Sequence, residues 1–172
     1  MEVNYSFFPT ASDMFQTEYK YVTYLFSAIH SWPVPVIRHL LTRVPIPRGN
    51  WIYQRLVLSA AWGRPLDGHE IIDLLVEQGQ DVNPKAATWR EPRGDDPGGT
   101  ALHAAVRAGS VPNVRCLLRY GPEILRDNEG RTPLELAEHL ERTEIAGILK
   151  DWLKGRGLPL DYEDEEPVFP KV

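Results

Sequence analysis

The five histidines are the residues of this chain best suited to chemistry, because imidazole serves as an acid, a base and a metal ligand near neutral pH. Their spacing limits what they can do together. His30 and His39 are nine residues apart, which does not place two ligands on one helix face as a spacing of four would. His139 follows Glu135 by four residues, so these two side chains could pair, and an exposed ion pair is the expected result. The sequence therefore predicts no metal site.

The other reactive residue types lack the neighbours that catalysis requires. Cys116 lies in an apolar stretch with no adjacent base or oxyanion site, so we expect a buried, inert thiol. Gly98-Gly99-Thr100 could receive an anion where a helix begins, but the lysine of a phosphate loop is missing. Asp95-Asp96 alone is insufficient for calcium. We expect a protein that is not an enzyme and has no cofactor.

Composition places the chain among globular proteins and argues against nucleic acid as a partner. Of the 172 residues, 42% are hydrophobic and 25% are charged, which excludes wholesale disorder and fits about one domain. The last twelve residues carry five carboxylates and one lysine, so the remainder is close to neutral although the net charge is -5. Proteins that read the phosphate backbone normally carry a basic surplus. Residues 155–172 are expected to form an acidic, solvated tail, with docking onto a basic partner as the less favoured alternative.

The same composition bears on the cellular compartment. No stretch approaches the ~20 consecutive apolar residues of a membrane-spanning helix. The first residues lack the basic start and the apolar run of a signal peptide, and one cysteine cannot form a disulfide framework. We expect a cytoplasmic or nuclear protein without membrane contact.

A repeat of 32 residues organises the second half of the chain. The interval separates Thr100 from Thr132 and also Leu102 from Leu134. Each unit predicts a capped first helix, a tight link and a second helix. In the first of these two units, Thr100 supplies the cap and Gly109 ends the first helix. The second unit has Glu141 in place of that glycine.

Two earlier units fit the pattern less clearly. Residues 68–83 are predicted to form a second helix and its exit turn, preceded by a first helix at 58–63 and a four-residue link at 64–67. A fainter unit covers 25–43, with residues 31–35 as its link. The expected apolar stripe of its second helix consists of Val36, Ile37, Leu40 and Leu41.

These units resemble ankyrin repeats. The resemblance rests on the segments GTALHAA at 99–105, TPLELA at 132–137, and GHEIIDLL at 68–75 followed by GQDVN at 79–83. The family's threonine-proline-leucine-histidine signature is divided, since Ala101 replaces its proline in one unit and Glu135 replaces its histidine in the other. The resemblance implies structural roles for His69 and His103.

The resemblance also implies the fold. We expect an all-α, ankyrin-like solenoid over residues 22–154, with about four helix-turn-helix repeats near 22–45, 56–83, 99–127 and 130–153. A stack of repeats exposes an apolar face at each end unless a cap covers it. Residues 1–21 carry aromatic side chains at helical spacing, so they are interpreted as an N-terminal capping helix; the alternative is an aromatic docking patch that could mediate self-association. At the other end, Trp152 is expected to seal the terminal face.

Residues 84–98 are longer than the usual turn of the family and form an expected loop insertion. Trp89 and its neighbouring arginines have the composition of a binding hot spot, and the alternative is that Trp89 folds back on the adjacent unit. By resemblance, partner contacts would come from the turns and first helices. The candidate partner-binding residues are Trp62, Trp89, Arg90, Arg93, Arg107, Asn128, Glu129, Arg131 and His139.

Three functional hypotheses follow from these observations. The favoured one is a non-catalytic protein–protein interaction module or adaptor that uses the concave face and loop tips. The alternative is a small enzyme or small-ligand binder in which His139, Glu135 or His103 acts as acid or base. A third, weaker hypothesis is that the acidic tail docks on the chain's own array and regulates it.

Overall fold

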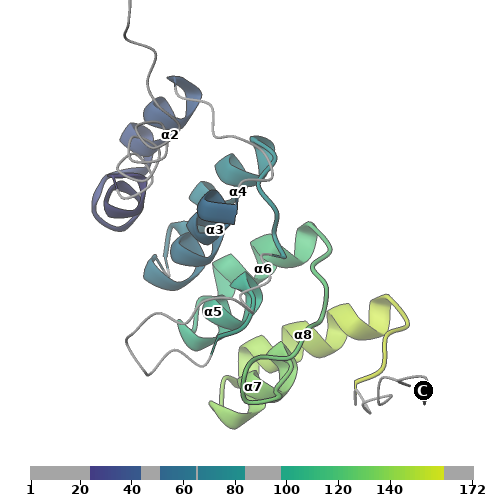
Figure 1. Ribbon diagram of the computed structural model, residues 1–172. Helices are drawn as coiled ribbons and strands as arrows, with labels where there is room; N and C mark the ends of the chain where they lie inside the picture. The colour runs from purple at the N-terminus through teal and green to yellow at the C-terminus, as the bar shows by residue number, and fades with distance from the viewer. Residues whose placement is uncertain (1–23, 44–50, 65, 84–97, 161–172) are drawn as a thin grey trace, which may run out of the picture.

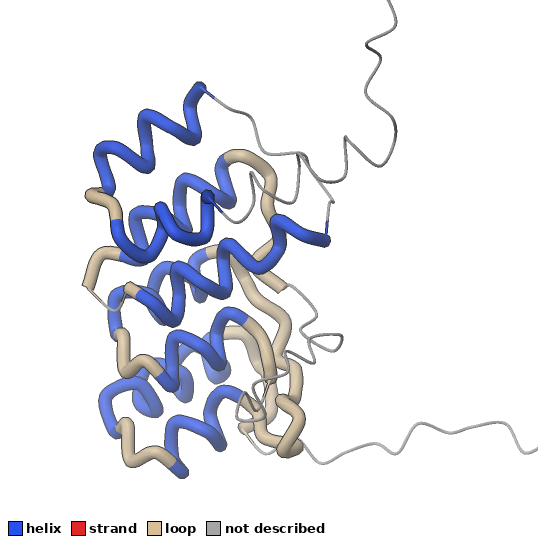
Figure 2. Tube along the Cα trace, turned by 60° about the vertical axis from the view of Figure 1, so that its left-hand side comes forward, coloured by secondary structure: helices blue, strands red, loops and turns tan. Residues whose placement is uncertain are grey.

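The chain forms a row of stacked helix pairs. The computed structural model describes residues 24–43, 51–64, 66–83 and 98–160, and across these ranges the regular secondary structure is helical, without strands. The pairs follow one another in chain order (Figure 1). Short links lie along one edge of the row and longer loops along the opposite edge (Figure 2). The predicted all-α solenoid is therefore confirmed, whereas the expected N-terminal cap at 1–21, residues 84–97 of the expected insertion and the tail from 161 onward lie outside the described residues.

Each pair contributes one helix to each of two layers. A helix over residues 24–31 pairs with α2 (Val34–Arg43). The later pairs are α3 (Trp51–Gly63) with α4 (Gly68–Glu77), α5 (Ala101–Arg107) with α6 (Val111–Arg119), and α7 (Pro133–His139) with α8 (Thr143–Gly155). The first helices α3, α5 and α7 contact one another in sequence, and so do the second helices α2, α4, α6 and α8.

Local sequence signals set the ends of these helices. Ser110 accepts a hydrogen bond from Asn113 N at 3.2 Å where α6 begins, with Pro112 in the first turn. Thr132 caps α7 in the same way through Glu135 N at 3.2 Å. The link after α5 contains Gly109 at φ 67°, a left-handed conformation that glycine adopts without a Cβ clash.

One apolar core runs through the array. The apolar stripe of α6 is buried, with exposed fractions from 0% to 5% for Val114, Cys116, Leu117 and Leu118. Leu25 and Ile29 of the first helix pair are buried at 1% and 0%. Because each pair buries its apolar side against its neighbours, no single pair could retain this core alone.

Polar side chains in the links join neighbouring pairs. Arg64, after α3, donates through Nη1 to the carbonyl oxygens of Ile29 at 3.0 Å and Trp32 at 2.7 Å. The next pair repeats the arrangement, since the buried Asn113 donates through Nδ2 to Ala61 O at 3.1 Å and Arg64 O at 2.9 Å. Both side chains donate to carbonyl groups at the end of the preceding first helix, where intrahelical partners are missing, and in its link, where Arg64 O also accepts from Gly68 N at 3.0 Å.

Two predicted boundaries in the earlier units were wrong. Helix α2 begins at Val34, inside the expected link, because Pro35 fits the first turn of a helix. Val34 is consequently 8% exposed, whereas Val36, expected in the buried stripe, is 46% exposed. Helix α3 also begins earlier than expected, at Trp51 rather than at residue 58.

The prediction for Trp152 was wrong as well. Its indole Nε1 donates to Leu118 O at the end of α6, at 3.1 Å, and the Arg156 guanidinium lies 4.5 Å from the centre of its ring. Trp152 therefore packs between the third and fourth helix pairs instead of sealing the terminal face. Its hydrogen-bonding N–H explains the difference, because the carbonyl groups that end α6 offer it an acceptor.

Replacing Glu141 by glycine is expected to stabilise the protein by roughly 0.5–1 kcal/mol. Glu141 has φ 56° in the link where the preceding repeat has Gly109, so an L-residue occupies a conformation that glycine adopts at lower cost. Chemical denaturation would measure the change. As a matched control, Glu144→Gly in the exposed first turn of α8 should destabilise the protein by a similar amount; a loss of stability in Glu141→Gly would contradict this interpretation of the link.

Candidate functional site

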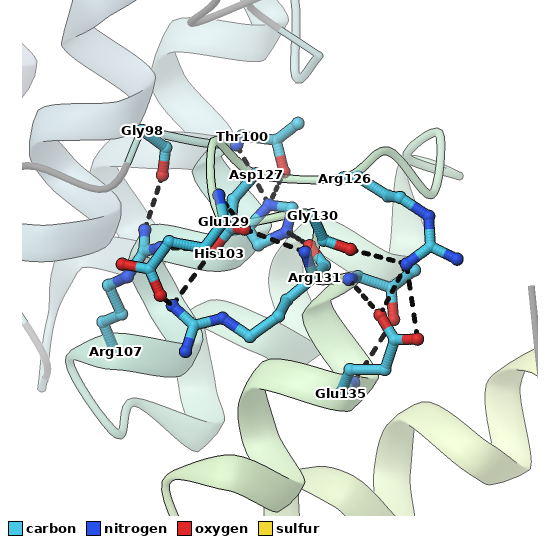
Figure 3. Close-up of polar contacts among 11 residues, drawn as sticks. Gly98, Thr100, His103, Arg107, Arg126, Asp127, Glu129, Gly130, Arg131 and Glu135 are labelled. Carbon is cyan, nitrogen blue, oxygen red and sulfur yellow. Dashed lines mark hydrogen bonds and ion pairs between the residues drawn. The ribbon is translucent and has the colours of Figure 1, made fainter. Parts of the chain in front are cut away.

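A tight turn over residues 127–130 precedes α7 and lies beside α5 (Figure 3). Asp127 N donates to Arg131 O at 2.9 Å, and Gly130 N donates to Asp127 O at 3.0 Å. The Asp127 carboxylate accepts two further bonds through Oδ1, from Glu129 N at 3.0 Å and Arg131 N at 2.9 Å. Backbone and side chain therefore fix the same turn, and its tip residues, Asn128 and Glu129, remain exposed.

A buried ion pair connects this turn to the preceding helix. The Asp127 side chain is 0% exposed and the Arg107 side chain is 10% exposed, and Arg107 Nη2 donates to Asp127 Oδ2 at 2.6 Å. Arg107 Nη1 donates to Gly98 O at 2.6 Å. Arg131 reinforces the turn, with a nitrogen 3.7 Å from the Asp127 carboxylate and an ion pair to Glu129. Both charges of the buried pair are thus compensated, which a buried charge requires.

His103 joins the same two repeats through its imidazole ring. Thr100 N donates to Nδ1 at 3.1 Å, which makes Nδ1 the acceptor and assigns the ring proton to Nε2. Nε2 then donates to Arg131 O at 2.9 Å. Burial lowers the pKa of His103 from its ordinary value of 6.5, because the charged ring would lose its hydration. His103 has the structural role that the resemblance implied.

Glu135 takes the equivalent position in the following repeat. Its carboxylate accepts from Thr132 N at 2.6 Å and from Arg126 Nη1 at 3.0 Å. Partial burial opposes ionisation, but these hydrogen bonds and the Arg126 charge outweigh it and lower the pKa of Glu135. The pairing with His139 that the spacing allowed does not form, because Glu135 caps its own helix and His139 lies exposed at the far end of α7.

The predicted partner-binding residues fall into three groups. Trp62, Asn128, Glu129 and His139 are exposed, Trp62 to 47%. Arg107 and Arg131 are directed inward and hold the turn. Trp89, Arg90 and Arg93 lie outside the described residues.

A groove of about 760 Å³ lies on the layer of second helices, between α6 and α8. His69 of α4 also borders it. Cys116 contributes to its wall, is 2% exposed and donates through Sγ to Asp73 Oδ1 at 3.2 Å. Burial, followed by the hydrogen bond to Asp73, raises the pKa of the Cys116 thiol to about 12. The thiol is therefore protonated at neutral pH, as expected for an inert cysteine.

The described residues hold neither a metal-binding cluster nor a membrane-spanning helix. Within those ranges, His, Cys, Asp and Glu side chains form no group of three or more that could hold a metal ion. No helix in the described part of the chain is both long enough and apolar enough to cross a bilayer.

Comparison with known families gives the same assignment as the geometry. A family model described as ankyrin repeats (3 copies) matches residues 56–155, more than half of the chain. The matched region contains the buried Arg107–Asp127 pair and the His103 bridge. The chain belongs to the ankyrin-repeat family.

Asp127→Asn is expected to destabilise the protein by about 3–5 kcal/mol, because the substitution leaves the buried Arg107 charge without its counterion. Denaturant unfolding would measure the loss. The matched control is Glu138→Gln, which removes an exposed partner of Lys150 and should cost less than about 1 kcal/mol. Equal, small effects for both variants would contradict the role of the buried pair.

Stability is expected to fall as the pH decreases from 7 to 5, in part because of His103. The pKa of His103 is lower in the folded chain than in the unfolded chain, so in acid the unfolded chain binds a proton that the folded chain excludes. The stability that the neutral ring contributes is therefore lost as the pH falls below about 6.5. His103→Gln should cost about 1–2 kcal/mol at pH 7 through its altered hydrogen bonds and should flatten the slope between pH 7 and 5. Unfolding free energies at both pH values would test this; an unchanged slope in the variant would exclude His103 as its source.

Proposed function

We propose that the chain is a non-catalytic adaptor that binds a protein partner through its turn tips and the exposed ends of its first helices. Ankyrin repeats generally serve as protein–protein interaction modules, and this chain is a member of the family. We also assign the helix pair at 24–43 to the array as its first repeat, because α2 contacts α4 as α4 contacts α6. No feature of the described residues favours catalysis as a second function.

The fixed turn at 127–130 is the observation that carries the proposal. Asn128 and Glu129 lie at its tip, while the buried Asp127 carboxylate holds the backbone beneath them. A partner that meets a preorganised surface loses less conformational entropy on binding than one that must order a loop.

Side-chain composition indicates where the binding energy would come from. Trp62 is a large aromatic side chain at the end of α3 and is 47% exposed, and tryptophan is enriched among interface hot spots. Asn128 and Glu129 would supply polar contacts from the turn. Trp89, Arg90 and Arg93 extend the proposed surface beyond the described residues. Arg107 and Arg131 support the turn from within and are not proposed as direct contacts.

The single, buried cysteine supports a reducing compartment, the cytoplasm or nucleus, as the place of action. The nearly neutral body of the chain supports a protein rather than a nucleic acid as the partner.

Affinity purification with matched variants tests this function. Trp62→Ala and the double variant Asn128→Ala/Glu129→Ala should each reduce capture of a specific partner by about tenfold or more, the loss expected on removing hot-spot contacts. The melting temperature should stay near that of the unmodified chain, because these side chains are exposed. The measurement is quantitative mass spectrometry of the captured proteins.

The control variant is Glu144→Ala/Lys154→Ala, which removes exposed charges from the second helix α8 and should leave capture unchanged. If the surface variants and the control capture the same proteins in the same amounts, the proposed surface is wrong.

A further inference from the structure

The groove between α6 and α8 has a floor suited to apolar side chains. Leu118 of α6 and Ile148 and Trp152 of α8 line it, and its volume is about 760 Å³. Trp152 and Ile148 are only partly buried although both pack against the core. The groove lies on the second-helix layer, whereas the proposed partner surface lies on the first helices and turns, so it calls for a separate explanation.

Positive charge borders this floor. Arg115 projects from α6 as an exposed side chain and, within the described ranges, has no carboxylate partner. Arg156 stacks on the Trp152 ring at 4.5 Å and likewise pairs with no described carboxylate. Arg119 is neutralised by Asp73 at 2.8 Å, and Asp151 contributes one negative charge to the wall. Among the lining residues Arg115 and Asp151 balance one another, so the positive excess beside the groove is the single charge of Arg156, on a chain whose net charge is -5.

The chain itself contains a segment of matching chemistry. Residues 161–172 hold five carboxylates against Lys171, and they contain the apolar residues Val168 and Phe169 between Pro167 and Pro170. A segment of this composition has little to bury by itself and repels itself electrostatically. It could gain both ion pairs and apolar contacts on a surface that presents arginines around an apolar floor.

The tail also starts in the right place. The chain turns back after α8, where Leu158 N donates to Leu153 O at 3.0 Å, and both Leu158 and Leu160 pack against the core. The segment from residue 161 thus begins beside the helix that forms one wall of the groove. Twelve extended residues span up to about 40 Å. Helix α8 is only about 20 Å long, so the tail reaches every part of the groove.

We propose that residues 161–172 dock in the groove between α6 and α8. The carboxylates of the tail face Arg115 and Arg156, and Phe169 packs on the floor formed by Leu118, Ile148 and Trp152. The tail then covers the second-helix layer of the third and fourth repeats and leaves the first helices and turns free for the partner.

Paramagnetic relaxation in the full-length chain tests this docking. A spin label is attached to Val172→Cys, and Cys116 stays unlabelled because its buried thiol is protonated. At about 0.01 M salt, the amide signals of Leu118, Ile148 and Asp151 and the indole signal of Trp152 should lose most of their intensity. At about 1 M salt, where the Debye length falls from ~30 Å to ~3 Å, the signals should recover.

Matched charge reversals separate docking from general attraction. Arg115→Glu and Arg156→Glu should each restore the signals at low salt, as should a tail carrying Glu163→Gln, Asp164→Asn, Glu165→Gln and Glu166→Gln. The control is Arg43→Glu, an exposed last-turn arginine of α2, which should leave the signal loss intact. The proposal would be overturned if Arg43→Glu restored the signals of the groove residues equally well. It would also be overturned if only the signals of residues 155–160 lost intensity.

A mixed sample identifies the molecule that supplies the tail. Isotope-labelled chain without a spin label is combined with spin-labelled chain that carries no isotope. Docking within one chain predicts full signal intensity in the mixture. Signal loss at Leu118 and Ile148 in the mixture would show that the groove takes the tail of a second copy, and it would overturn docking within the chain.

Discussion

The structure depends on one constraint, which is that carbonyl groups at the ends of short helices must be satisfied where the repeats stack. The last carbonyl groups of a helix lack intrahelical partners. Side chains of the adjacent pair supply the donors: Arg64 reaches Ile29 O and Trp32 O, and Asn113 reaches Ala61 O and Arg64 O. Apolar burial provides the driving force for stacking, and these bonds fix its register.

Polar contacts between repeats also shape the proposed binding surface. His103 donates from the preceding repeat to Arg131 O, which also accepts from Asp127 N, and Arg107 supplies the counterion for the buried Asp127 carboxylate. The turn at 127–130 is thus held by a repeat to which it does not belong. Stacking and recognition are therefore linked, because damage to the third repeat would release the turn that the fourth repeat presents.

Local features could be predicted from the sequence, and features that join distant residues could not. The cap at Thr132 and the left-handed Gly109 depend on residues within one turn of the chain, so their types and spacing sufficed. Arg107 and Asp127 are 20 residues apart, and nothing in their spacing distinguishes a buried pair from two exposed charges. Trp152 could have faced the open end of the array or the third helix pair, and the acceptor that decided its direction, Leu118 O, is a backbone atom.

Amide hydrogen exchange at the turn tests the central claim most directly. Glu129 N and Arg131 N both donate to the buried Asp127 carboxylate although the turn lies at the surface. If the preceding repeat holds the turn, both amides should exchange as slowly as amides inside α5 and α7, through opening of the array. Exchange of both amides at the rate of an unstructured peptide, while the helices stay protected, would contradict the claim.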